Sequence, residues 1–140
     1  IGERLKADGG AALIIDYGYA AGAGFPRPPL GTLQAVRGHR SVHPLESPGA
    51  ADLSLHVDFD LIARSAREGG ARSFGPITQR DFLQLCGVEA RAAVLDRKAD
   101  QAQKASIAAG YARLTDPGGM GGLFKVLALT GPGVDAPGFS

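Results

Sequence analysis

The sequence predicts an α/β fold, and two observations carry this prediction. Apolar runs at residues 11–17 and 123–130 are each too short for a helix and are typical of strands buried on both faces, as in the middle of a parallel sheet. The segments between them carry apolar residues at helical spacing and end at glycine stops. Helices that alternate with buried strands along a chain are typical of βαβ units.

The first third of the chain is predicted to be a helix, a strand and a long loop. Residues 1–8 have helix-forming composition and precede a glycine pair that stops a helix. The strand at 11–17 is expected to end in Asp-Tyr-Gly, because residues 18–31 are too rich in glycine and proline for regular structure. Residues 32–37 alternate polar and apolar side chains, which predicts a short strand with one wet face.

The middle of the chain predicts helices around a second strand. Asp58 is well placed as the N-cap of a helix that ends near Glu68. The strand at 71–77 is less apolar than the first, and its proline favours a place near a sheet edge. Residues 78–115 have helical patterns interrupted at Gly87.

The final strand at 123–130 is expected to be covered on both faces except at Lys125. The preceding Met120-Gly121-Gly122 predicts only a turn. The single cysteine, Cys86, excludes an internal disulfide and fits a small apolar residue on a buried helix face better than a nucleophile.

Charge and composition argue against several classes of binding partner. Fifteen Lys and Arg against fourteen Asp and Glu give a formal charge of +1, so neither nucleic acid nor an anionic membrane is favoured as a partner. No apolar run reaches 18 residues, so we predict no membrane span. The chain begins with Ile rather than Met and enters a helix at once, so we expect it to be part of a longer domain.

Asp16 and Tyr17 are the first candidate site residues. Ligands of parallel α/β sheets bind beyond the carboxyl ends of the strands, where these two residues follow the first buried run. A carboxylate there would orient a cationic or hydroxyl-bearing substrate through charge-assisted hydrogen bonds. The alternative that Asp16 only caps the following loop is equally favoured. His56 is either a proton carrier or a structural histidine, and Asp58 fits a helix cap better than a catalyst.

Other polar motifs predict less. Arg37, His39 and His43 lie in a turn-rich stretch without a third metal ligand nearby, so they are expected to face solvent or substrate, and no metal site is predicted. Gly22-Ala23-Gly24 does not open a helix and is soon followed by Pro26. The segment therefore does not match a phosphate-binding loop.

Several of these motifs together resemble the C-terminal half of the MidA-type methyltransferases. This family includes a mitochondrial complex I assembly factor with protein-arginine methyltransferase activity. The similarity extends over nearly the whole chain, in order and in spacing. The segments that carry it are 10–19 (with Leu-Ile-Ile-Asp-Tyr-Gly), 32–35, Arg37 with His39, 51–59, 75–79, Phe82-Leu83, Gly87, the helix before Leu114, Met120-Gly121 and 124–129.

The resemblance implies a Rossmann-like, seven-stranded class I fold that binds S-adenosylmethionine. Strands near 11–17, 71–77 and 123–130 would be the fifth, sixth and seventh, the last antiparallel beside the fifth, with a helical insertion at 78–115. Residues 1–140 would then be the C-terminal portion of the methyltransferase domain. The cofactor's glycine-rich turn and ribose-binding acid belong to the N-terminal half, which is absent, so no cofactor contact is assigned to this chain.

The implied function is methylation of a protein side chain, an arginine, on a partner of the respiratory-complex type. The implied location is the cytoplasm of a bacterium, or the matrix for mitochondrial relatives, and a homo-oligomer is possible. This chain alone is expected to be inactive. The alternative is a non-catalytic binding or assembly module that uses the helical insertion. The expected site residues are Asp16 and Tyr17 as catalytic, and Gly18, Arg37, His39 and His56 as substrate-binding.

Overall fold

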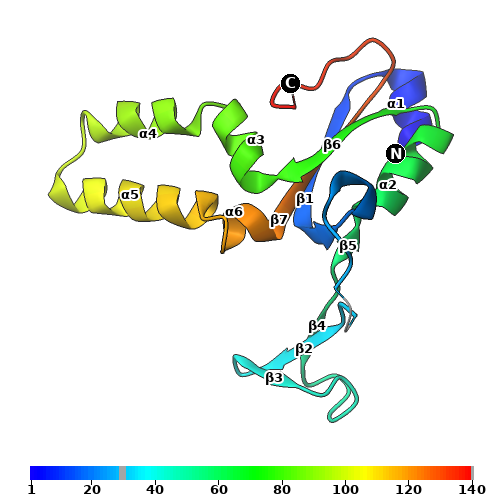
Figure 1. Ribbon diagram of the computed structural model, residues 1–140, viewed down its shortest axis with the longest axis horizontal. Helices are drawn as coiled ribbons and strands as arrows, with labels where there is room; N and C mark the ends of the chain where they lie inside the picture. Colours follow the sequence, from blue (N-terminus) through cyan, green and yellow to red (C-terminus); the bar gives the residue numbers. More distant parts are fainter. Residues whose placement is uncertain (29–30, 140) are drawn as a thin grey trace.

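The computed structural model describes residues 1–28 and 31–139, and its centre is a four-stranded sheet (Figure 1). The strand order is β5-β1-β7-β6, with β1 at Ala11–Tyr19, β5 at Val57–Asp58, β6 at Arg72–Thr78 and β7 at Phe124–Thr130. Strand β7 runs antiparallel to both β1 and β6. The three predicted strands therefore exist within two residues of their expected bounds, and the last is antiparallel beside the first, as expected.

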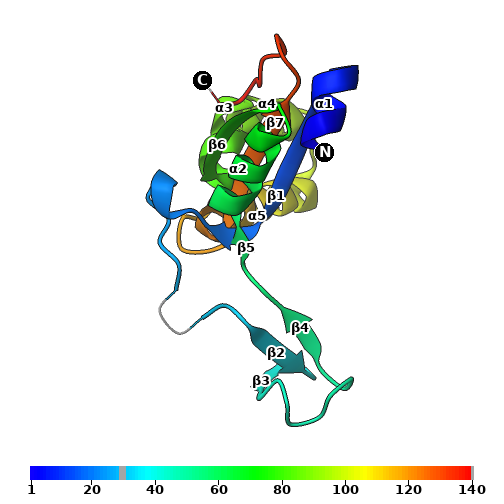
Figure 2. The same cartoon turned by 90° about the vertical axis from the view of Figure 1, so that its right-hand side faces the viewer.

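A second, smaller sheet lies away from the first in both views (Figures 1 and 2). Its order is β3-β2-β4, with β2 at Gln34–Arg37, β3 at Arg40–Val42 and β4 at Asp52–Ser54. The strand expected at 32–37 is the central one. Its two partners have three residues each, too few for a recognisable alternation, and the sequence did not predict them.

Two helices cover one face of the main sheet. Helix α1 is Gly2–Asp8 and α2 is Phe59–Glu68. Both contribute to the hydrophobic core with β7, through Leu5 of α1, Phe59 of α2, and Leu127 and Leu129. Phe59, Leu127 and Leu129 are at most 1% exposed, so this layer excludes water almost completely.

Four further helices follow β6, and the first three fill the segment expected as a helical insertion, 78–115. They are α3 at Gln79–Leu85, α4 at Val88–Asp96, α5 at Gln101–Thr115 and α6 at Met120–Leu123. Helices α4 and α5 form a hairpin that extends from the sheet, while α3 and α6 contact β6 and β7 (Figure 1). In the described part of the chain, no helix is both long and apolar enough to span a membrane.

The helix boundaries follow local capping chemistry. Asp58 accepts a hydrogen bond from the Leu61 N–H at 3.0 Å, which confirms its predicted role as the N-cap of α2. Thr78 caps α3 in the same way. Gly87 separates α3 from α4 with a φ of 79°, a backbone conformation that glycine adopts without strain.

The prediction that both faces of β1 are covered is wrong for the described residues. Leu13 and Ile15 are 48% and 47% exposed, while Ala12 and Ile14 pack on the core. From Ala11 to Tyr17 the strand pairs only with β7, and β5 pairs with Gly18 and Tyr19 alone. A continuous apolar run cannot show whether neighbours for both faces lie in the same stretch of chain.

Five smaller expectations also need correction. Strand β1 continues through Tyr19 rather than ending at Asp16-Tyr17, and a short 3₁₀ helix, η1 at Ala21–Ala23, interrupts the expected loop. Residues 120–123 form helix α6 rather than only a turn. Cys86 is exposed at the end of α3. Lys125 is buried, with 6% of its surface exposed, because β7 lies between two strands.

We predict that the α2–β7 layer dominates stability. Phe59→Ala removes a fully buried ring and should lower the free energy of unfolding by about 3–5 kcal/mol. Leu61→Ala on the same helix, 49% exposed, is the matched control and should cost about 0.5 kcal/mol. Urea unfolding followed by circular dichroism measures both. Equal losses for the two variants would contradict the assigned core.

Candidate functional site

Asp16 and Tyr17 lie beside the first residues of β7. Asp16 is directly opposite Lys125, and Tyr17 is opposite Phe124. Successive residues of a strand point to opposite faces, and directly opposite residues of an antiparallel pair share a face. Asp16 and Lys125 therefore face the α1–α2 core layer, and Tyr17 and Phe124 face the other side. The two predicted catalytic residues do not point into one common space.

The Asp16 side chain is held by its own backbone. Its Oδ1 accepts a hydrogen bond from the Tyr17 N–H at 2.8 Å, and the residue is half-buried. This contact resembles the loop-capping alternative, although the carboxylate lies within a strand. In the described residues Asp16 takes part in no ion pair within 4.0 Å. The carboxylate is thus oriented by a local hydrogen bond rather than by a salt bridge.

Tyr17 is the centre of an aromatic row. Its ring centroid lies 5.4 Å from that of His56 at an interplanar angle of 68°, and 5.8 Å from that of Phe124 at 80°. Edge-to-face geometry of this kind stabilises a pair by about 0.5–1.5 kcal/mol beyond area burial. His56 directly precedes β5, whose parallel pairing with β1 brings it beside Tyr17. The structure therefore does bring these two predicted residues together.

Gly18 has a packing reason to be glycine. A Cβ at this position would lie 2.4 Å from the Val57 carbonyl oxygen and 2.5 Å from the Phe59 ring. Both distances are shorter than van der Waals contact, so β5 and α2 approach this backbone closely. The predicted substrate-binding role of Gly18 has no support from this geometry, and it stays a prediction.

Arg37 and His39 lie on the smaller sheet, apart from Asp16 (Figure 2). Arg37 donates hydrogen bonds to Ser47 Oγ at 3.1 Å and Glu46 Oε1 at 3.2 Å. His39 sits at the exposed turn between β2 and β3 with a φ of 61°. The structure does not bring them to the Asp16 end of β1.

Lys125 is the polar residue that the sequence did not assign to the site. Its Nζ donates to the carbonyl oxygens of Gly122 and Leu123 and lies 4.8 Å from the ring centroid of Phe25. Burial lowers the pKa of Lys125 below its ordinary value of 10.5. One signal was available in the sequence: Lys125 is the single charge inside an otherwise apolar strand.

The loop that follows β1 is closed by its own hydrogen bonds. The Gly22 N–H donates to Asp60 Oδ2 at 3.1 Å, and the Ala20 N–H donates to the Phe25 carbonyl at 2.7 Å. Since the Gly22 N–H already has a carboxylate partner, this loop does not provide a cradle of free N–H groups for an anion.

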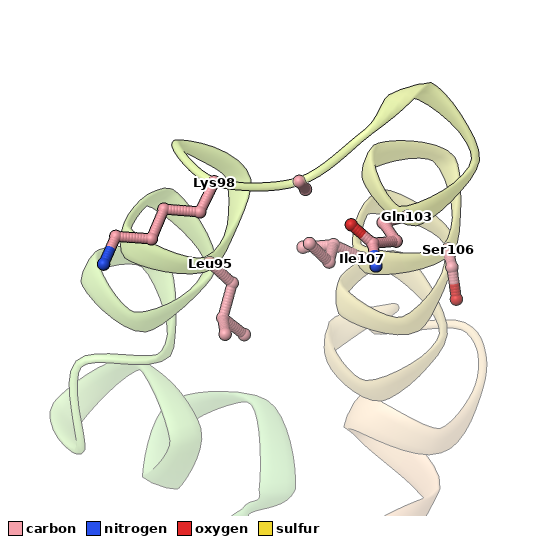
Figure 3. Close-up of a pocket in the computed structure, with 6 residues that line it drawn as sticks. Leu95, Lys98, Gln103, Ser106 and Ile107 are labelled. Atoms are coloured by element: carbon pink, nitrogen blue, oxygen red, sulfur yellow. The ribbon is translucent and has the colours of Figure 1, made fainter.

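A surface hollow of about 310 Å³ lies between α4 and α5 (Figure 3). Leu95 and Ile107 face the space between the two helices and Gln103 lies beside Ile107, while the Lys98 side chain extends to the outer side of its helix. It is placed beside the turn that joins these helices, at the end of the hairpin farthest from β1 (Figure 1). The hollow is therefore separate from the candidate site.

Comparison with known proteins identifies the family. Residues 1–77 match a family described as "Putative S-adenosyl-L-methionine-dependent methyltransferase". The chain belongs to this methyltransferase family. The match contains β1 with Asp16, the smaller sheet and β5 with α2, so the candidate residues before β6 lie within the family's own segment.

Curated relatives extend the similarity beyond residue 77. The mitochondrial protein arginine methyltransferase NDUFAF7 homolog of Drosophila melanogaster is 40% identical over 135 residues, which cover 96% of this chain and 29% of the fly protein. The mouse protein arginine methyltransferase NDUFAF7 is 37% identical over 130 residues, 92% of this chain and 28% of its own length. The chain thus spans less than a third of these relatives.

Two solved structures from Burkholderia thailandensis share the fold. One, bound to S-adenosyl-homocysteine, is 32% identical with a TM-score of 0.78 and covers 91% of this chain and 33% of its own. The other is 30% identical with a TM-score of 0.84 and covers 99% of this chain and 38% of its own. These matches confirm the predicted α/β fold of a methyltransferase and include the helical hairpin.

We predict that Gly18 does not tolerate a side chain. Gly18→Ala places a methyl group against the Val57 carbonyl and the Phe59 ring and should destabilise the fold by about 1–3 kcal/mol. Gly110→Ala in α5 is the control, because a Cβ there meets nothing within 4 Å and should stabilise by about 0.5–1 kcal/mol. Thermal unfolding separates the two. A neutral Gly18→Ala would refute the close approach.

We also predict that Lys125 makes the stability of the fold depend on pH in the alkaline range. Because burial lowers its pKa in the folded state, the unfolded chain binds this proton more tightly, and stability rises with pH between the folded pKa and about 10.5. Lys125→Met loses this gain. Urea midpoints from neutral pH toward 10.5 should therefore shift in favour of the wild type relative to Lys125→Met. A difference that stays constant with pH would contradict the lowered pKa.

Proposed function

We propose that the protein containing this chain is an S-adenosylmethionine-dependent methyltransferase that acts on an arginine side chain of a protein. The supporting observation is the agreement over 91% of the chain with a structure bound to S-adenosyl-homocysteine. The arginine substrate is supported by the names of relatives that are 37–40% identical to this chain. The family resemblance adds a respiratory-complex type of substrate, in a bacterial cytoplasm or a mitochondrial matrix.

In this proposal the chain is the C-terminal portion of the methyltransferase domain, with residues 78–115 as its helical insertion. The cofactor, which supplies the methyl group, is held by residues outside this chain. Two observations support the division. The chain spans about a third of the matching solved structures, and the outer edge of β1 from Ala11 to Tyr17 pairs with nothing in the described residues. That edge is where further strands would add.

Asp16 is the proposed carboxylate for the substrate. A guanidinium carries its charge over a plane of N–H donors, which match carboxylate oxygens. The Tyr17 N–H fixes Asp16 Oδ1, so the orientation of the carboxylate is set before a substrate arrives. A charge-assisted hydrogen bond to one guanidinium nitrogen would hold a second nitrogen in position for methylation, and that nitrogen would release a proton to solvent as its bond to the methyl carbon forms. Catalysis would then rest on positioning and on preorganised charge.

The other predicted residues take secondary roles in this proposal. His56 fixes the Tyr17 ring by an edge-to-face contact. Gly18 allows α2 and β5 to approach this end of β1. Arg37 and His39, which are exposed on the smaller sheet, would contact a protein substrate away from its reacting side chain.

We predict that Asp16→Asn in the full-length protein lowers kcat/KM for an arginine peptide by about 100-fold or more, because the neutral amide loses the charge-assisted bond. Cofactor affinity, measured by calorimetry with S-adenosyl-homocysteine, should stay within about twofold, a change of less than 0.5 kcal/mol. Asp8→Asn, at the exposed end of α1, is the matched control. Unchanged turnover in Asp16→Asn would remove Asp16 from the mechanism.

A further inference from the structure

Lys125 is the one charged side chain that is buried in the described part of the chain. Burying an ammonium costs free energy unless other groups replace its water. Two carbonyl oxygens at the end of α6, those of Gly122 and Leu123, and the face of the Phe25 ring supply this replacement. In the described residues it forms no ion pair within 4.0 Å. The charge is therefore solvated by the protein without being neutralised.

The position of this charge is set by the register of β7. Lys125 is opposite Asp16 on one side and Thr78 on the other. It continues the row of Leu129 and Leu127, whose neighbours on β1 are Ala12 and Ile14. These pairs face the core layer, so Asp16 and Lys125 share a face at the end of that row. The ammonium is thus carried to the same end of the sheet as the candidate carboxylate.

The same ammonium also contacts the loop that follows β1. Phe25 closes that loop by a pair of backbone hydrogen bonds with Ala20, which is completely buried. The contact between Lys125 Nζ and the Phe25 ring therefore joins β7 to the loop. One buried side chain links the end of α6, the loop and the strand position opposite Asp16.

We propose that Lys125 is a positioning residue that acts through Asp16. Lys125 occupies the β7 position directly opposite Asp16, and its ammonium contacts the Phe25 ring in the loop that follows β1. This inference rests on the proposed methyltransferase function. It concerns a residue that does not touch the substrate and that the sequence pattern placed in solvent.

If Lys125 served packing alone, Lys125→Met would leave kcat/KM unchanged. Replacing a buried charge by an apolar side chain of similar volume is often neutral or stabilising, and water can reach the half-exposed end of α6 after the exchange. Lys125→Met should therefore keep the melting temperature of the full-length protein at neutral pH within a few degrees, while it lowers kcat/KM for an arginine peptide by about ten- to hundredfold. Lys104→Met, at an exposed ion pair with Asp96, is the matched control and should change neither.

The decisive experiment is a double-mutant cycle in the full-length protein. Lys125→Met, Asp16→Asn and the double variant are compared by kcat/KM for an arginine peptide, with S-adenosyl-homocysteine affinity as the check on the cofactor site. If Lys125 acts through Asp16, adding Lys125→Met to Asp16→Asn should cost less than about threefold. Phe25→Leu keeps the charge but loosens the loop, and should give a smaller loss than Lys125→Met.

The outcomes separate the two proposals. Independent, multiplicative losses from Lys125→Met and Asp16→Asn would overturn the positioning role and leave the methyltransferase proposal intact. A Lys125→Met variant with wild-type kcat/KM would also overturn it. A wild type that transfers no methyl group to arginine peptides, but does bind S-adenosyl-homocysteine, would overturn the substrate assignment and this inference together.

Discussion

The placement of β7 between β1 and β6 is the constraint on which the rest of the structure depends. All seven of its residues pair with β1, five of them also pair with β6, and six are buried. Its first residues, Phe124 and Lys125, lie against the last part of β1, so the antiparallel direction brings the start of β7 to Asp16 and Tyr17. A parallel β7 would bring its carboxyl end there, and the buried ammonium would lie at the opposite end of the sheet.

The pleat of β1 divides the candidate site into two sides. Asp16 and Lys125 form a charged side against the α2 layer, while His56, Tyr17 and Phe124 form an aromatic row on the other face. The residues of each side come from different parts of the chain, and only the register of three strands brings them together. A slip of β1 by one residue would disrupt both groups of side chains, because every side chain of the strand would then point to the opposite face.

The sequence predicted the elements whose signals are local. The cap at Asp58, the stop at Gly87 and the strand at 123–130 depend on neighbouring residues, and all three are confirmed. The strands β3, β4 and β5 have two or three residues, and pairing rather than local pattern defines them. The placement of Lys125 was wrong for a related reason: a lysine in an apolar strand predicts a solvated position unless the tertiary structure supplies carbonyls and a ring around it. The pairing of Asp16 with Lys125 needed a register that no sequence pattern contains.

The exposed side of β1, like the family match, concerns whether further strands of the domain belong beside this chain. Leu13 and Ile15 point away from the α1–α2 layer, and in the described residues no strand pairs with the edge beside them from Ala11 to Tyr17. Stable proteins cover or blunt such an edge, because it invites pairing with other chains. Here β5 covers only the last two residues, beside Gly18 and Tyr19, where β1 passes beyond β7. A further strand added along the open edge parallel to β1, as β5 is, would bring its carboxyl end toward Asp16. The open edge of β1 thus fits the proposed division, in which further strands of the domain add beside this chain.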